Sequence, residues 1–302
     1  MDFDPRDSDS RDRERDDDRE RTLDSRDVFT RDMNLPHGLE REIVRHRDRE
    51  YTLRGSESRT LTTVGSFRVV SSRDLRDGRD RELNSRSGDL RHLREQGLVE
   101  TVRVAGTRDH AVVLTKEGRA LLESHRDPRD RDPDGRQTFY DGLKRERELE
   151  HDLGVYRAYE REAERLHKGG AQIERVVLDY ELKSEYQRWL HERDKDRADY
   201  DGHPDRTPDE IRNWAYEHDL PYSADDGVQF PDLRIEYRDE DGREDHRDVE
   251  VTTEHYRGSH GASVASSGFS CHRGSSLRFG GGGGGGGGSS SHGRGLAEEL
   301  WD

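Results

Sequence analysis

The chain has 302 residues, of which 40% are charged and 27% hydrophobic, and its formal net charge is −16. So low a hydrophobic content predicts that part of the chain is disordered, and the negative charge excludes a protein that coats nucleic acid indiscriminately. With one cysteine, Cys271, the chain cannot form an internal disulfide. We expect a cytoplasmic protein without membrane contact, because no apolar run approaches the roughly 18 residues of a membrane span and no apolar signal segment begins the chain.

Composition divides the chain into two tails, two foldable regions and a linker. Residues 1–36 are mainly Asp and Arg, and residues 278–302 include nine consecutive glycines. These compositions predict a disordered charged tail and a flexible Gly/Ser-rich tail. Residues 128–139 contain Pro and Gly, which interrupt helices, so they are predicted to link a domain over 37–127 to a domain over 140–277.

The two foldable regions differ in charge. Residues 51–127 contain 15 basic and 12 acidic side chains, whereas residues 140–277 contain 21 basic and 34 acidic side chains. This asymmetry is what a nucleic-acid-binding module beside an acidic partner domain would show.

The first foldable region predicts the order helix, helix, helix, hairpin, helix. Apolar side chains recur at helical spacing over 57–70 and 84–98, and a shorter helix is predicted over 71–77, with Leu75 directed to the core. β-branched runs over 99–104 and 110–115 surround a turn-rich tip and predict a hairpin. The last helix is predicted to begin after Thr115, a typical N-cap residue.

This order resembles a winged helix-turn-helix, and the run LRHLREQGLVETVRVAGTRDHAVVLTKEGRALLE is similar to the same part of the MarR-type bacterial regulators. The resemblance implies double-stranded DNA as the partner and a homodimer formed through this domain. In such proteins the third helix enters the major groove and the hairpin wing contacts phosphates, and arginine suits both contacts. The predicted DNA-binding residues, on the solvent face of the third helix and on the wing, are Ser85, Arg86, Asp89, Arg91, Arg94, Arg103, Thr107 and Arg108.

The second foldable region predicts an α/β arrangement. An amphipathic helix over 147–168 precedes a buried type of strand over 173–180 and a helix over 181–195. Thr207, Pro208 and Glu210 have the spacing of a capping box at the start of a helix over 207–220. A hairpin over 230–252 and a small-residue helix over 258–269 complete the region.

The hairpin FPDLRIEYRDEDGREDHRDVEVT can pair in two registers. A two-residue turn at Asp241 and Gly242 would mix charged and apolar side chains on both faces. A three-residue loop over 240–242, with Gly242 left-handed, would place Leu233 opposite Val249 and separate charged from apolar faces. We therefore expect the second register.

In that register Asp232 lies opposite Glu250, with side-chain bases about 5 Å apart. Like charges at this spacing repel unless a cation, a proton or an arginine lies between them. A divalent metal held by carboxylate oxygens is one solution.

The same residues carry a family resemblance. A "PD" dipeptide followed after 17 residues by "EVT" resembles the core motif of PD-(D/E)xK nucleases. The order of a winged helix, a helix that contains "HDL" and these two strands is similar to the replication-relaxation family. The resemblance covers residues 40–277 and implies a restriction-endonuclease-like α/β fold. It implies Asp232 and Glu250 as ligands of Mg²⁺ or Mn²⁺, with His151 and Asp152 as the helix motif. Thr252 stands at the catalytic position where these nucleases have a lysine that orients or activates the attacking water.

Members of the replication-relaxation family are associated with plasmids and conjugative elements. The sequence therefore predicts a DNA-binding protein of a mobile element, acting in replication, transfer or its regulation, with a metal-dependent nuclease-like domain. The alternative is a winged-helix transcriptional regulator whose second domain senses a ligand or a protein partner without cleaving DNA. A third interpretation is an adaptor that binds only proteins.

Overall fold

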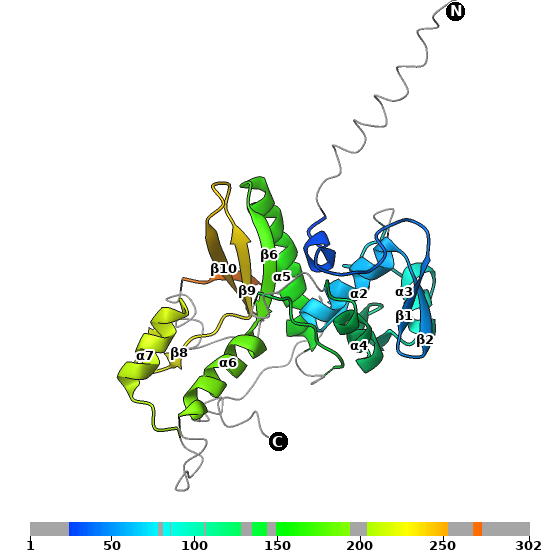
Figure 1. The fold of residues 1–302 in the computed structure, drawn as a ribbon. Coiled ribbons are helices and arrows are strands. Elements are labelled where there is room, and N and C mark those ends of the chain that lie inside the picture. Colours follow the sequence, from blue (N-terminus) through cyan, green and yellow to red (C-terminus); the bar gives the residue numbers. More distant parts are fainter. Residues whose placement is uncertain are drawn as a thin grey trace, which may run out of the picture.

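The computed structural model describes residues 24–77, 81–84, 86–105, 107–127, 135–143, 149–193, 204–252 and 268–273. Within these ranges the chain is a mixed α/β protein with six α-helices and four small sheets (Figure 1). None of the helices in the described ranges is both long enough and apolar enough to cross a membrane.

The first half of the structure, residues 24–127, is built around one central helix, α2, and a three-stranded antiparallel sheet of order β3-β5-β4. Thr115 caps the last helix as predicted, because its hydroxyl accepts a hydrogen bond from the Gly118 amide at 3.0 Å. The elements in chain order are η1 (Asp27–Thr30), β1 (Glu42–His46), β2 (Arg49–Leu53), α2 (Gly55–Phe67), β3 (Val70–Ser71), α3 (Gly88–Glu95), β4 (Val99–Arg103), β5 (His110–Leu114) and α4 (Lys116–Ser124).

The predicted helix over 71–77 is wrong. Leu75 is buried as expected, but strand β3 and a turn occupy this stretch. The Ser71 hydroxyl donates to Asp109 at 2.6 Å and accepts from the Arg73 amide at 3.1 Å. Serine side chains that bond nearby backbone groups favour turns as well as helix caps, and here the turn forms.

Part of the predicted charged tail is folded. Phe29, Met33 and Leu35 are buried, although they lie in the stretch 1–36 that composition assigns to disorder. The Phe29 ring lies 5.5 Å from the ring of Phe67, measured between centroids. A few apolar side chains in a charged run are therefore enough to fix residues 24–36 on the core, while residues 1–23 lie outside the described part of the chain.

The second half, the described residues from 149 to 273, contains a four-stranded sheet of order β11-β10-β9-β6. In this sheet β9 is antiparallel to β6 and β10, and β11 is parallel to β10. The predicted helices at 147–168, 181–195 and 207–220 and the strand at 173–180 are confirmed apart from their ends. Most of the predicted helix over 258–269 lies outside the described residues, and β11 was not predicted. The elements are α5 (Leu149–Lys168), β6 (Gln172–Leu178), α6 (Asp179–Glu192), α7 (Pro208–Glu217), β7 (Tyr222–Ser223), β8 (Gly227–Val228), β9 (Leu233–Arg238), β10 (Glu244–Thr252) and β11 (Ser270–Arg273).

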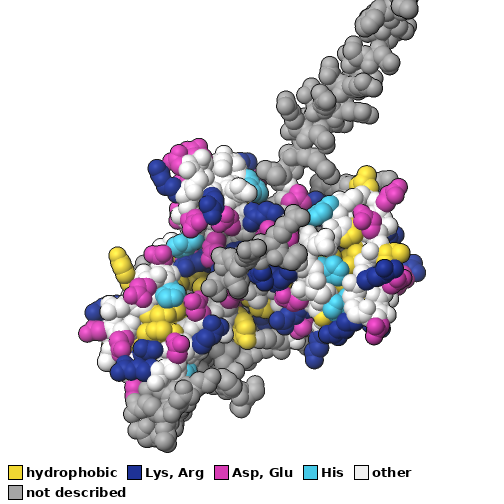
Figure 2. Space-filling model, viewed as in Figure 1, with side chains coloured by type: hydrophobic (Ala, Val, Ile, Leu, Met, Phe, Trp, Pro, Cys, Tyr) yellow, Lys and Arg dark blue, Asp and Glu magenta, His cyan; other side chains and the backbone are white. Residues whose placement is uncertain are grey.

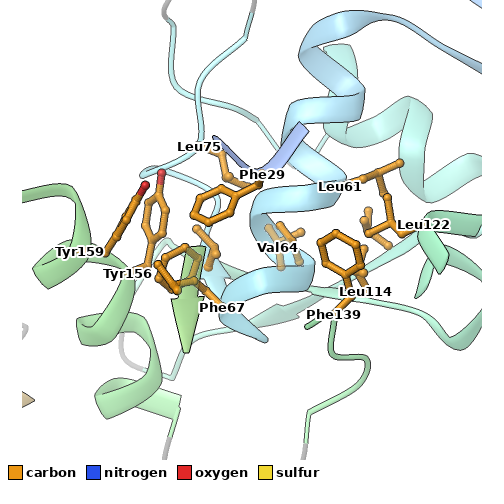
Figure 3. Packing of buried hydrophobic residues seen from close by; sticks show 14 of the residues in the cluster. Phe29, Leu61, Val64, Phe67, Leu75, Leu114, Leu122, Phe139, Tyr156 and Tyr159 are labelled. Carbon is orange, nitrogen blue, oxygen red and sulfur yellow. The ribbon is translucent and has the colours of Figure 1, made fainter. Parts of the chain in front are cut away.

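One hydrophobic core joins the two halves (Figure 3). The ring of Phe67, at the end of α2, lies 5.0 Å from Tyr156 and 4.9 Å from Tyr159, both on α5. Phe139, at the end of the predicted linker, is also buried in this core. The core therefore contains residues of both predicted domains, because α5 packs against α2 and β3 as well as against the four-stranded sheet.

Helix α5 covers one face of the four-stranded sheet through a close contact at Gly154. A Cβ atom at Gly154 would lie 2.9 Å from Cγ1 of Val251 on β10, which is closer than real Cβ atoms approach. The missing side chain lets the helix approach the strand and sets the first turn of α5 beside the end of the sheet. The opposite face of the sheet carries Arg234, whose guanidinium donates to Asp248 and to the carbonyls of His218 and Asp219 after α7.

Candidate functional site

The β9–β10 hairpin adopts the register expected for the three-residue loop. Leu233 pairs with Val249 and Arg234 with Asp248, and Gly242 has a φ of +80°. Strand β9 begins at Leu233, so Asp232 lies one residue before it. If the register is continued by one residue, Asp232 lies opposite Glu250. The sequence prediction of this register is confirmed.

Two elements, β10 and α5, meet at the Asp232 carboxylate. Its Oδ2 atom accepts a hydrogen bond from the Val251 amide of β10 at 2.8 Å and lies 3.1 Å from Nε2 of His151. His151 lies in the first turn of α5, which the contact at Gly154 holds against β10. The structure therefore brings together Asp232 and His151, which are 81 positions apart in the sequence.

Glu250 is the second carboxylate of the site and is only 5% exposed. Burial and the negative charge of Asp232 raise the pKa of Glu250 to about 8, although the Asp232 backbone, His151 and Lys183 act in the opposite direction. The repulsion expected from the register is therefore present. At neutral pH this carboxyl group retains its proton unless another positive charge enters the site.

His151 supplies a positive charge to the site. Burial alone would lower the pKa of His151, but hydrogen bonds to Asp152 and Asp232 raise it to about 10. The imidazolium therefore offsets the charge of Asp232, and a positive charge is one of the three ways to relieve the repulsion between facing carboxylates. Arginine does not take that role, because Arg234 binds Asp248 at 2.8 Å.

The two acidic side chains of this site, Asp232 and Glu250, offer carboxylate oxygens, which are the ligand type that Mg²⁺ and Mn²⁺ prefer. Among the residues that the structure describes, no three His, Cys, Asp or Glu side chains are grouped as metal ligands. Mg²⁺ needs only one or two carboxylates, since it retains several waters and also binds substrate phosphates. Asp232 and Glu250 are the two side chains that would hold such an ion, and a divalent cation would remove the repulsion that keeps Glu250 protonated.

Thr252 and Lys183 occupy different parts of this site. The Thr252 hydroxyl, at the position where the nuclease motif has lysine, lies 3.4 Å from the His272 carbonyl of β11. Lys183 of α6 acts electrostatically on Glu250, and sequence reasoning missed it. No local signal could identify Lys183, because the pairing of β6 with β9 is what brings the start of α6 to the end of the hairpin.

The predicted DNA-contact residues divide into exposed arginines and one buried acid. Ser85 lies outside the described residues, and Thr107 is half-buried at the hairpin tip. The exposed arginines, from α3 and its approach and from the β4–β5 hairpin, are Arg86, Arg91, Arg94, Arg103 and Arg108. Figure 2 shows basic and acidic side chains interspersed on the visible face of the molecule rather than gathered by sign.

The predicted solvent-facing position of Asp89 is wrong. Asp89 is 1% exposed, accepts a hydrogen bond from the Ser56 hydroxyl at 2.6 Å and forms an ion pair with Arg54. It shares the inner face of α3 with Leu90 and Leu93, so it fixes α3 to the start of α2. Arg91 and Arg94 lie on the other side of the helix.

We expect Glu250→Gln to stabilise the metal-free protein at pH 9 and to change little at pH 4. The folded state binds the Glu250 proton up to a pKa of about 8, against the usual 4.5. The stability from that proton is therefore fully present below about pH 4.5 and is lost as the pH rises through 8. Glutamine mimics the protonated acid at every pH.

Urea unfolding of both proteins in EDTA at pH 4, 6.5 and 9 tests this expectation. At pH 9 the free energy of unfolding of Glu250→Gln should exceed that of the wild type by at least about 1 kcal/mol, since one pKa unit corresponds to about 1.4 kcal/mol. Glu244→Gln is the matched control, because Glu244 lies on the same strand with its side chain 75% exposed. A difference for Glu250→Gln that does not vary with pH would contradict the assignment.

Comparisons of the chain with protein-family models, with curated proteins and with solved structures give no match.

Proposed function

We propose that this chain is a DNA-binding protein of a mobile element whose four-stranded sheet carries a divalent-metal site for phosphodiester cleavage. The observation that carries the proposal is the pair of carboxylates at the ends of β9 and β10. The register of the hairpin, continued by one residue, sets Asp232 opposite Glu250, and the Asp232 carboxylate accepts a hydrogen bond from the amide of Val251, the residue after Glu250. A divalent cation between the two carboxylates would replace the proton on Glu250 and allow both groups to be charged.

The first half supplies the DNA-binding part of the proposal. The order α2, β3, α3, β4, β5, α4 supports a winged helix in which a turn replaces the second helix. Arg91 and Arg94 lie exposed on α3, and Arg103 and Arg108 lie exposed on the hairpin that would be the wing. These are the two elements that contact the major groove and the phosphates in winged helices.

The chain's own residues would prepare the site for a phosphate group. Asp232 and Glu250 would hold the metal, which when bound supplies Lewis acidity and a more acidic water. His151, positively charged beside Asp232, would attract the phosphate backbone and orient Asp232 through its Nε2 hydrogen. Gly154 keeps His151 in this place, because it allows α5 to approach β10.

The proposed metal site predicts stabilisation by Mg²⁺ or Mn²⁺. A ligand present at 100 times its dissociation constant stabilises the folded state by about 2.7 kcal/mol, which raises the melting temperature by several degrees. We expect this rise in the wild type at pH 7.5 and its loss in Glu250→Gln. Glu244→Gln should retain it, and an equal rise in all three proteins would show binding elsewhere and contradict the site.

A regulator that binds DNA without cleaving it is the second candidate. Thr252 at the lysine position favours it, as does the neutralisation of Asp232 by His151. In that case the carboxylate cluster would fix α5 to the sheet, and the second half would bind a protein partner or a ligand. Binding of duplex DNA with no metal-dependent melting shift would favour this candidate. A homodimer through the first half is predicted under both functions.

A further inference from the structure

Lys183 lies at the end of the sheet that carries the two carboxylates. Helix α6 begins at Asp179, directly after β6, and the Asp179 amide donates to the Asp232 carbonyl at 3.2 Å. One helical turn later, Nζ of Lys183 lies 2.9 Å from Oδ2 of Asp179. The ammonium group is thus anchored to the residue that bonds the backbone of Asp232.

The surroundings of Lys183 leave it open to a ligand. Its side chain is 42% exposed, whereas Glu250 is buried. A lysine that is both anchored beside the carboxylates and accessible to solvent can contact an anion bound at them.

We propose that Lys183 supplies the positive charge that Thr252 cannot, and that its ammonium group contacts the phosphate bound at Asp232 and Glu250. The inference rests on the proposed nuclease function and assigns a catalytic residue to it. The lysine would come from a helix 69 positions before Thr252 in the sequence, and the pairing of β6 with β9 would bring it to the site.

The reaction that this arrangement fits is hydrolysis of a phosphodiester. The oxygen of water forms a bond to phosphorus and loses a proton to solvent, while one ester bond of the phosphorus breaks. The departing oxygen takes up a proton from solvent and leaves as a hydroxyl group, so no oxidant or further reactant is required. Lys183 transfers no proton; it stabilises the negative charge that increases on the phosphoryl oxygens in the transition state.

Cleavage of supercoiled plasmid DNA in Mg²⁺ or Mn²⁺ tests the assignment with Lys183→Met. Methionine keeps most of the side-chain volume but removes the charge. We expect kcat to fall about 10²- to 10³-fold, the range found when one transition-state donor is removed. The melting shift caused by the metal should stay close to that of the wild type, and Lys183→Arg should recover part of kcat.

Lys168→Met is the matched control, because Lys168 forms the same kind of i,i+4 ion pair, with Glu164 at 2.7 Å. It lies at the far end of α5, about 25 Å from His151 at a rise of 1.5 Å per residue. Cleavage by Lys183→Met at the wild-type rate would overturn the inference and leave the metal site standing. It would also be overturned if the wild type binds metal but cleaves no DNA. Absence of a metal response in the wild type would instead refute the proposed function itself.

Discussion

Replacing Phe67 with alanine is expected to lower the free energy of unfolding by about 3–5 kcal/mol. Phe67 is 2% exposed and packs edge-on against Phe29 and Tyr156 and tilted against Tyr159. Its removal leaves a cavity between α2 and α5 that neither helix can close without losing its other contacts. Because the same ring contacts both halves, we also expect the two halves to unfold together.

Urea unfolding followed by far-UV circular dichroism and by tryptophan fluorescence measures both effects. The chain has three tryptophans: Trp189 and Trp214 lie in the second half, and Trp301 lies outside the described residues. All variants are therefore compared in a Trp301→Phe background, in which fluorescence reports the second half. Tyr216→Ala is the control, since Tyr216 is 83% exposed and should change stability by no more than about 0.5 kcal/mol. Two separate transitions in the wild type, or a loss below about 1 kcal/mol for Phe67→Ala, would contradict the shared core.

Binding to duplex DNA is expected to weaken about 10³-fold or more between 50 and 200 mM salt if six phosphates are neutralised. The exposed arginines of α3 and of the β4–β5 hairpin give the physical reason, because each phosphate contact releases counterions. Fluorescence anisotropy with a labelled duplex measures the slope. The full chain is the correct sample, because the core that Phe67 and Phe139 share with the second half would be broken in a shorter fragment.

The same assay with single substitutions identifies the contact surface. Arg91→Ala and Arg94→Ala should each weaken binding by roughly 1–3 kcal/mol if the residue contacts a base. Arg243→Ala is the control, because Arg243 is an exposed arginine between β9 and β10, away from α3. Equal losses for all three variants would indicate unspecific attraction, and absence of salt-dependent binding would make the first half a docking module.

Local patterns predicted the elements of the second half well. The capping box of Thr207 and Glu210 is present at α7, and the charge pattern of the hairpin selected the observed register. These features depend on residues close in sequence. The charge alternation was informative because a slip by one residue would have moved every side chain of the strand to the other face.

Contacts between distant segments were the part that the sequence could not predict. Phe29 lies in a run of Asp and Arg, yet its ring packs against Phe67 and Tyr159, which are distant in the sequence. Helical spacing predicted that Asp89 faces solvent, but Asp89 is buried and forms an ion pair with Arg54, the residue directly before α2. Lys183 reaches the candidate site only through the order of strands in the sheet.

Cleavage of duplex DNA in Mg²⁺ and in Mn²⁺ by the wild type and by Asp232→Ala tests the proposed nuclease site most directly. Asp232 links three parts of the site, because it lies beside His151, accepts from the Val251 amide and raises the pKa of Glu250. A nuclease site at Asp232 and Glu250 predicts metal-dependent cleavage by the wild type, its suppression by EDTA and its loss in Asp232→Ala, with DNA affinity unchanged. Equal cleavage by both proteins, or none by the wild type with either metal, would contradict the assignment of a nuclease site to these carboxylates.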